Sequence, residues 1–188
     1  MIHSPRFKAV LDACVLYPAP LRDFLLSIAE VGMFKPFWTE KIHEEGTESL
    51  LIKRPDLKRK SLDKAVMAMN TAFPDSNIEN YESLINTVEL PDPDDRHVKA
   101  AAVKESTDVI VTINIKDFPD KVASKYDIEI MHPDQFICHF IDLDKEKIKL
   151  AFSNQLSRLK NPPLEASDVF NILKKTGLSK SIERLKKY

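Results

Sequence analysis

The chain contains 188 residues, of which 43% are hydrophobic, so it can bury a substantial core and fits one domain with an appendage better than two full domains. Its 28 Lys and Arg residues are balanced by 29 Asp and Glu residues, so the net charge excludes the strongly basic class of nucleic-acid binders and says nothing more about partners. The two cysteines exclude a disulfide framework, and no apolar stretch reaches the roughly 18 residues of a membrane span, so we expect a cytoplasmic, soluble protein with no membrane partner.

The N-terminal part of the chain predicts strands alternating with helices. Phe7–Leu11 is mostly apolar and is typical of a short buried strand. Apolar residues then recur at helical spacing from Leu21 to Gly32, and Met33–Trp38 predicts a connection or a short strand. Thr39 is placed to cap the next helix, and Leu57–Phe73 predicts a further amphipathic helix.

The middle of the chain continues this alternation. Asn77–Tyr81 suggests a short strand, and the turn Pro91–Asp95 precedes a helix of small residues, Arg96–Lys104. Val109–Ile113 is a continuous β-branched run that predicts a strand buried on both faces, and Ile128–Met131 predicts a shorter one. Such an alternation is typical of a parallel α/β sheet.

From Pro133 onward the pattern is helical only. The predicted helical segments are Phe136–Phe140, Lys145–Leu159, Ala166–Lys175 and Lys180–Lys187. We therefore divide the chain into a domain of residues 1–140 and a helical C-terminal extension of residues 141–188. Lysines on the last helices indicate either the solvated face of packed helices or a surface for phosphates or a partner helix.

Acidic residues lie where a parallel sheet binds ligands, beyond the carboxyl ends of its strands. Asp12 ends the first strand, Asp117 comes four residues after Val109–Ile113, and Asp94 or Asp95 stands at a helix start. Carboxylates that converge repel one another, so a cation is needed to offset the repulsion. Because oxygen ligands select hard ions, the pattern predicts a site for Mg²⁺ or Mn²⁺.

Each of these acids also has an ordinary explanation. Asp12 could cap a loop, Asp94 and Asp95 could be helix N-caps, and Asp117 could be a turn residue. Only the joint pattern favours a site.

Histidines and aromatic residues near the expected site have ordinary roles as well. The histidines are His43, His97 and His132. They do not pair at a helical ligand spacing, so polar roles are favoured over a transition-metal site. The aromatic residues at the second strand-to-helix junction are Phe34, Phe37 and Trp38. Their large apolar surface predicts core positions in preference to stacking on bases.

Four segments, in this order, resemble the PIN-domain family between about Phe7 and Phe140. They read VLDACVL from Val10, WTEKIHEE from Trp38, PDPDDRHVKAAA from Pro91 and VIVTINIKDF from Val109. The resemblance implies that Asp12 is the first metal ligand and Glu45 the glutamate of the second segment, and that Asp95 fits the third position better than Asp94.

In the fourth segment the resemblance makes Asp117 the last acid. Asn114 stands where many members of the family have Asp, so Asn114 and Thr112 are expected to be polar supports. Arg22 and Lys116, near the expected edge of the site, are candidate phosphate contacts.

The implied fold is a three-layer α/β/α PIN-like domain with a central parallel sheet, followed by C-terminal helices. The implied function is a Mg²⁺- or Mn²⁺-dependent endoribonuclease that hydrolyses RNA, the toxin of a VapC-type toxin–antitoxin pair. The expected partners are the RNA substrate and an antitoxin protein, and the family resemblance allows a homodimer. Two alternatives stay open: a weakly active or inactive PIN-like module that binds RNA or protein, for which Asn114 is the best support, and a metal-dependent phosphatase or DNA nuclease.

Overall fold

A parallel four-stranded sheet forms the centre of the computed structural model, which describes residues 7–119, 126–160 and 162–187. The strand order is β2-β1-β3-β4, and all three neighbouring pairs are parallel. The strands are β1 (Lys8–Leu11), β2 (Lys35–Phe37), β3 (Val109–Val111) and β4 (Glu129–Met131).

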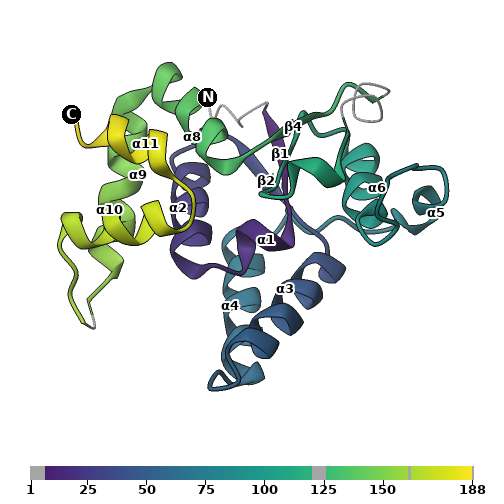
Figure 1. Ribbon diagram of the computed structural model, residues 1–188, viewed down its shortest axis with the longest axis horizontal. Coiled ribbons are helices and arrows are strands. Elements are labelled where there is room, and N and C mark those ends of the chain that lie inside the picture. Colours follow the sequence, from purple (N-terminus) through teal and green to yellow (C-terminus); the bar gives the residue numbers. More distant parts are fainter. Residues whose placement is uncertain (1–6, 120–125, 161, 188) are drawn as a thin grey trace.

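Helices cover both sides of this sheet, with α2 and the C-terminal helices on one side and α5 and α6 on the other (Figure 1). The N-terminal helices are α1 (Ala13–Leu16), α2 (Ala19–Glu30), α3 (Glu40–Lys53), α4 (Arg59–Ala72), α5 (Glu82–Ile85) and α6 (Arg96–Glu105), with a 3₁₀ turn η1 (Ile115–Asp117). The C-terminal helices are α8 (Pro133–Leu143), α9 (Lys145–Arg158), α10 (Ala166–Lys175) and α11 (Ser179–Leu185). The expected α/β/α fold with C-terminal helices is confirmed.

The two central strands are apolar because both of their faces are covered. Val10 of β1 lies opposite Ile110 of β3, and both side chains are fully buried. Because all four strands run in the same direction, their carboxyl ends lie along one edge of the sheet. Asp12 and Thr112 are the first residues beyond the ends of these two neighbouring strands, so the register brings them together.

Local signals explain several helix ends. The Thr39 side chain accepts a hydrogen bond from the Ile42 backbone N–H, so its predicted role as N-cap of α3 is confirmed. Gly32 follows α2 with a φ of 77°, a conformation that favours glycine.

Other predictions differ from the structure. Asn77–Tyr81 does not form a strand, because it pairs only through an isolated bridge between Asn77 and Trp38, and the chain turns at Asn80 with a φ of 58°. The strand expected over Val109–Ile113 ends at Val111. The short helices α1 and α5 were not predicted, because four residues are too few to show a helical period.

The C-terminal helices pack on the N-terminal part of the chain. The rings of Phe24 in α2 and Phe152 in α9 meet edge to face with centroids 6.1 Å apart, and Gln155 Nε2 donates to the Pro20 carbonyl at 2.9 Å. Helix α8 is continuous from Pro133 to Leu143, so the predicted division after residue 140 falls inside a helix. That division stays a prediction.

Helices α10 and α11 bury their apolar side chains. Some of their basic side chains form ion pairs with acidic residues of the same chain. Lys174 lies 3.5 Å from Glu183, and Arg184 pairs with Asp142. The buried residues of the two helices and their connection include Val169, Leu173, Leu178, Ile182 and Leu185. These contacts favour the interpretation of packed helices with solvated lysines. Within the described ranges, no helix has the length and apolar character needed to cross a membrane.

Candidate functional site

Asp12 stands where β1 ends and α1 begins, and the residue is 5% exposed. Oδ1 accepts a hydrogen bond from the Ala13 backbone N–H at 2.6 Å, which is the capping role. Oδ2 accepts one from the Thr112 hydroxyl at 2.7 Å, across from the neighbouring strand β3. Asp12 therefore caps a helix and also belongs to a polar cluster at the carboxyl edge of the sheet.

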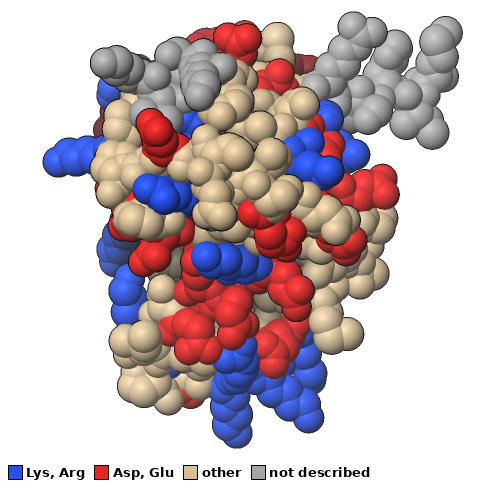
Figure 2. Space-filling model, turned by 90° about the vertical axis from the view of Figure 1, so that its right-hand side faces the viewer, with Lys and Arg blue, Asp and Glu red and all other residues tan. Residues whose placement is uncertain are grey.

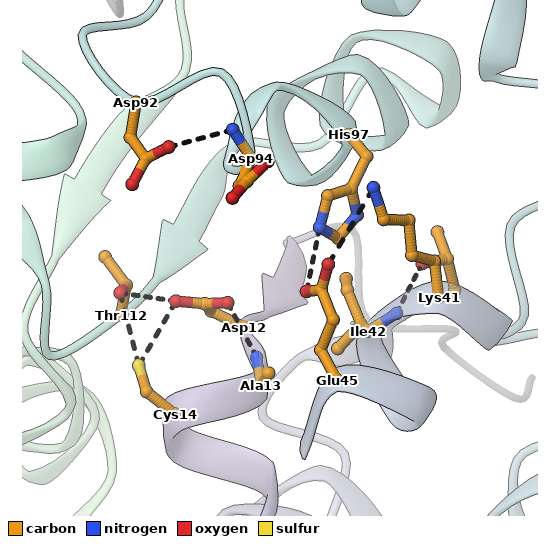
Figure 3. A network of polar contacts seen from close by, with 11 residues as sticks. Asp12, Ala13, Cys14, Lys41, Ile42, Glu45, Asp92, Asp94, His97 and Thr112 are labelled. Carbon is orange, nitrogen blue, oxygen red and sulfur yellow. Dashed lines mark hydrogen bonds and ion pairs between the residues drawn. The ribbon is translucent and has the colours of Figure 1, made fainter. Parts of the chain in front are cut away.

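The Cys14 thiol extends this cluster (Figure 3). Burial, followed by the charge of Asp12, raises the pKa of Cys14 to about 12, so the thiol stays protonated. It can therefore donate to Asp12 Oδ2, 3.1 Å from Sγ, while Sγ accepts from the Ile113 backbone N–H at 3.2 Å. The Thr112 hydroxyl accepts from the Asn114 N–H at 3.0 Å. Cys14 and Thr112 thus tie the loop after β3 to the Asp12 carboxylate.

Glu45 of α3 and His97 of α6 meet in the same region (Figure 3). His97 Nε2 lies 2.9 Å from Glu45 Oε2, and the His97 side chain is 1% exposed. Lys41, one turn before Glu45, lies 3.8 Å from its other oxygen. The buried imidazole therefore links the two helices and fixes the direction of the Glu45 carboxylate.

The aspartates before α6 lie in one another's electric field. Asp92 Oδ1 accepts from the Asp94 backbone N–H at 2.9 Å, which orders the turn. Asp95 occupies the N-cap position of α6, but its side chain makes no capping hydrogen bond to the described helix. Burial, and then the charges of Asp12, Asp117 and Asp92, raise the pKa of Asp95 to about 6. The acids from separate segments are thus close enough to interact.

A pocket of about 450 Å³ opens between these elements. Its lining residues are Asp12, Ala13, Cys14, Tyr17, Glu45, Ser49, Lys53, Asp94, Asp95 and Asn114. We call it the acid pocket. The predicted site residues that line it are Asp12, Glu45, Asp94, Asp95 and Asn114, whereas Asp117 acts on Asp95 through its charge.

The acid pocket suits a hard divalent cation by its donor chemistry. Its donors are carboxylate, amide and hydroxyl oxygens, which Mg²⁺ and Mn²⁺ prefer. Burial, and then the charges of neighbouring aspartates, raise the pKa of Asp95, and a bound cation would favour its ionised form. Over the described ranges, however, no three His, Cys, Asp or Glu side chains lie close enough together to hold one ion. The donors are gathered, but they do not form a closed coordination shell.

Negative charge extends beyond the acid pocket. Figure 2 shows the side of the molecule that carries α5 and α6, where Asp and Glu side chains gather at the centre. A separate pocket formed by the start of α3 and the segment leading into α5 is lined by four glutamates, which are Glu40, Glu44, Glu79 and Glu82. Lys41 also lines this pocket and Glu44 pairs with Arg59, so part of this negative charge is offset.

Neither of the two predicted phosphate contacts is among the residues that line the acid pocket. Arg22 pairs with Asp23 at 3.0 Å and lines two other pockets, which adjoin α2 and α4. Lys116 is exposed in η1, next to Asp117. Their contact with phosphate stays a prediction, and the position of Arg22 does not favour it.

Five lining residues of the acid pocket were not predicted as site residues: Ala13, Cys14, Tyr17, Ser49 and Lys53. A usable signal was present, because Glu45, Ser49 and Lys53 are spaced four residues apart and so share one face of α3. Nothing local marked Tyr17, which follows the unpredicted helix α1.

The remaining candidates have structural roles. The prediction that Phe34, Phe37 and Trp38 belong to the core is confirmed, since none is more than 1% exposed. His43 packs on Trp38 with ring centroids 5.4 Å apart, and His132 caps α8 by accepting from the Asp134 N–H.

Comparisons with known proteins agree with this geometry. The family model described as PIN domain matches residues 8–116, and the model described as VapC50 C-terminal domain matches residues 133–187. A protein of Mycobacterium tuberculosis named "Putative ribonuclease VapC50" is 39% identical over 79 residues, which cover 42% of this chain and 47% of that protein. The aligned part thus spans about half the length of the relative.

Proposed function

The chain belongs to the PIN-domain family, as its motifs predicted, and from this premise we propose that it is a divalent-metal-dependent endoribonuclease and the toxin of a toxin–antitoxin pair. The observation that carries the proposal is the acid pocket. Carboxylates from distant parts of the chain line it, and the acids that the resemblance assigned to metal binding interact within it or beside it.

In the proposed reaction, Asp12, Asp95 and Asp117 would be the residues that hold the cation, and Glu45 would orient the attacking water or contribute to a second ion. A bound Mg²⁺ or Mn²⁺ would lower the pKa of a water molecule and neutralise charge on the attacked phosphate. The protein's own contribution is orientation. Thr112 directs its hydroxyl to Asp12 Oδ2, and Asn114 lines the pocket as a neutral oxygen donor.

His97 is the proposed positioning residue for Glu45. The imidazole lies 2.9 Å from the Glu45 carboxylate and is buried, so it restricts the directions that the carboxylate can adopt. A carboxylate already oriented in the free protein loses less freedom when the reaction begins.

The proposed partners are inferred from the relative and from the C-terminal match. The name of the relative describes a ribonuclease, and residues 133–187 match a C-terminal domain named after the same protein. We therefore extend the proposal to an RNA substrate, an antitoxin protein that restrains the enzyme, and a cytoplasmic location. A homodimer is compatible with the proposal.

The second candidate function is a weakly active or inactive PIN-like module that binds RNA or protein. Asn114 favours it, because an amide in the acid pocket contributes no negative charge toward a cation. The acid pocket favours the nuclease, because carboxylates from separate segments line it and such oxygen ligands suit a hard cation.

Cleavage of a mixed cellular RNA preparation tests the proposal. The purified protein is expected to cleave RNA with Mn²⁺ and not with EDTA, and the Asp12→Asn and Asp95→Asn variants should lose about 100-fold or more in rate. The matched control is Asp75→Asn, an exposed carboxylate outside the acid pocket, which should cleave like the wild type. Absence of both cleavage and metal binding would favour the module, and cleavage only of DNA or of phosphate monoesters would favour the other hydrolases.

The toxin role has its own test. Induced expression should arrest bacterial growth, and Asp12→Ala should relieve the arrest. Normal growth with abundant, folded wild-type protein would contradict the toxin role while leaving the nuclease activity to the cleavage assay.

A further inference from the structure

One end of the acid pocket carries an aromatic and a basic side chain that the proposed chemistry does not use. Tyr17 follows α1, and Lys53 is the last residue of α3, at the end that runs away from the sheet in Figure 1. Lys53 Nζ donates to the Tyr17 hydroxyl at 3.1 Å and lies 5.0 Å from the centroid of its ring. The two side chains therefore form one unit in the lining of the pocket.

Backbone packing fixes this unit relative to the acids. A Cβ placed on Gly46 would lie 3.5 Å from Tyr17 Cβ, so α3 passes directly beside the end of α1. Glu45, Ser49 and Lys53 line the pocket along one face of α3, and eight residues of helix separate the first from the last by about 12 Å. A short stretch of a single strand can thus contact Lys53 and the acids at once.

The charges around the pocket favour an approach from this end. Among the described residues that line the acid pocket, Lys53 is the one basic side chain. Its ammonium group contacts the neutral Tyr17 hydroxyl, so no carboxylate in that contact cancels its charge. At the opposite end of α3, Glu40, Glu79 and Glu82 line the separate pocket with Lys41, so negative charge exceeds positive charge there and favours phosphate binding at the Lys53 end.

From these contacts we infer that Tyr17 and Lys53 form a subsite for single-stranded RNA, in which Lys53 binds a phosphate and the Tyr17 ring stacks on a base. The inference rests on the proposed function for its choice of RNA. An aromatic face accepts any base, and a lysine reads phosphate only as charge, so the subsite orders the strand without selecting its sequence.

Binding can be measured without cleavage. The probe is a fluorescein-labelled single-stranded RNA of mixed sequence, titrated with the full chain in EDTA at several salt concentrations and followed by fluorescence anisotropy. Lys53→Ala should weaken binding about tenfold and lower the slope of log affinity against log salt by about 0.7, the value for one phosphate contact on a single strand. Tyr17→Leu should weaken binding by a similar factor without changing the slope, and Tyr17→Phe should bind like the wild type.

The control is Lys60→Ala, which removes an exposed lysine of α4 that does not line the acid pocket. It should bind as the wild type does, and circular dichroism should show every variant folded. Lys53→Ala and Tyr17→Leu variants that bind as tightly as the wild type, or a wild type that does not bind the RNA, would overturn the inference.

The binding assay tests the subsite and the cleavage assay tests the nuclease, so either proposal can be contradicted without the other. Binding that depends on Tyr17 and Lys53 without cleavage would support the subsite and contradict the nuclease. Cleavage with binding unaffected by either substitution would support the nuclease and contradict the subsite.

Discussion

Asp95 lies partly buried in the field of Asp12, Asp117 and Asp92, and its pKa is raised from 3.8 to about 6. A carboxyl group whose pKa is higher in the folded than in the unfolded protein loses its stabilising contribution as the pH rises through the folded value. Without metal, ionised Asp95 should therefore destabilise the protein above about pH 6 and not below pH 3.8.

The Asp95→Asn variant tests this electrostatic cost. At about pH 8 in EDTA, the free energy of unfolding of this variant should be about 1 kcal/mol higher than that of the wild type. This value is reduced for solvent screening, because Asp95 is partly exposed. Below pH 3.8 the difference should vanish, and Mn²⁺ should stabilise the wild type more than the variant. Urea titrations provide the measurement, and an equal difference at both pH values would contradict the explanation.

His97 is the second residue whose role can be isolated. In the His97→Ala variant the Glu45 carboxylate loses its buried partner, so we expect kcat for RNA cleavage to fall about tenfold with little change in KM. His97→Gln, whose amide can still donate, should recover part of the loss.

A double-mutant cycle separates this role from general damage to the fold. If His97 acts through Glu45, the variant lacking both side chains should be no slower than Glu45→Ala alone. Fully additive losses in kcat would show that the two residues act independently.

At the scale of elements, Asp134 joins the C-terminal helices. This residue of α8 is 8% exposed, and its carboxylate accepts from the Lys180 N–H at 2.9 Å and from the Ser181 N–H and hydroxyl at 2.8 and 2.6 Å. It thereby satisfies backbone donors in the first turn of α11 from a distant part of the chain.

Asp134→Ala should lower the free energy of unfolding by about 2–3 kcal/mol, because it leaves buried donors without their charged acceptor. Urea titration followed by far-UV circular dichroism measures the loss, with Asp75→Ala as the exposed control. A loss below about 0.5 kcal/mol, the range of ordinary surface substitutions, would show that α11 docks without this carboxylate.

The elements were predictable where a pattern ran over several turns. Helix α9 was expected over Lys145–Leu159 and ends at Arg158, since each turn repeats the same apolar signal. Asn77–Tyr81 was wrongly assigned as a strand, because its few residues match an extended pattern while its partner offers a single bridge. The secondary structure of a short segment depends more on the elements that pack against it than on its own residues.

At the scale of the whole molecule, α9 covers the face of α2. Phe152 meets Phe24 edge to face, and Arg158 pairs with Glu30 at 2.5 Å. A fragment that ends at Leu143 would expose this apolar surface, so the predicted N-terminal domain should be less stable by itself than in the full chain.

We expect the fragment of residues 1–143 to melt about 10 °C or more below the full chain and to bind an apolar dye such as ANS. Thermal circular dichroism and dye fluorescence provide the measurements. A fragment as stable as the full chain would show instead that the extension is an independent unit.

The order of the longer helices, the parallel α/β pattern and the family could be predicted from sequence patterns, and the acids expected at the site, except Asp117, line the acid pocket. These properties depend on residues that are close together in the sequence. The spacing of apolar residues indicates which face of an element is buried, and the motifs indicate which residues follow each strand. Only the packing of the elements established which side chains meet. Thr112 and Asp12 are 100 residues apart, Glu45 and His97 are 52 apart, and Lys53 meets Tyr17 only because α3 packs beside α1. Such contacts depend on how whole elements pack, and the sequence pattern of one element does not indicate which other element packs beside it.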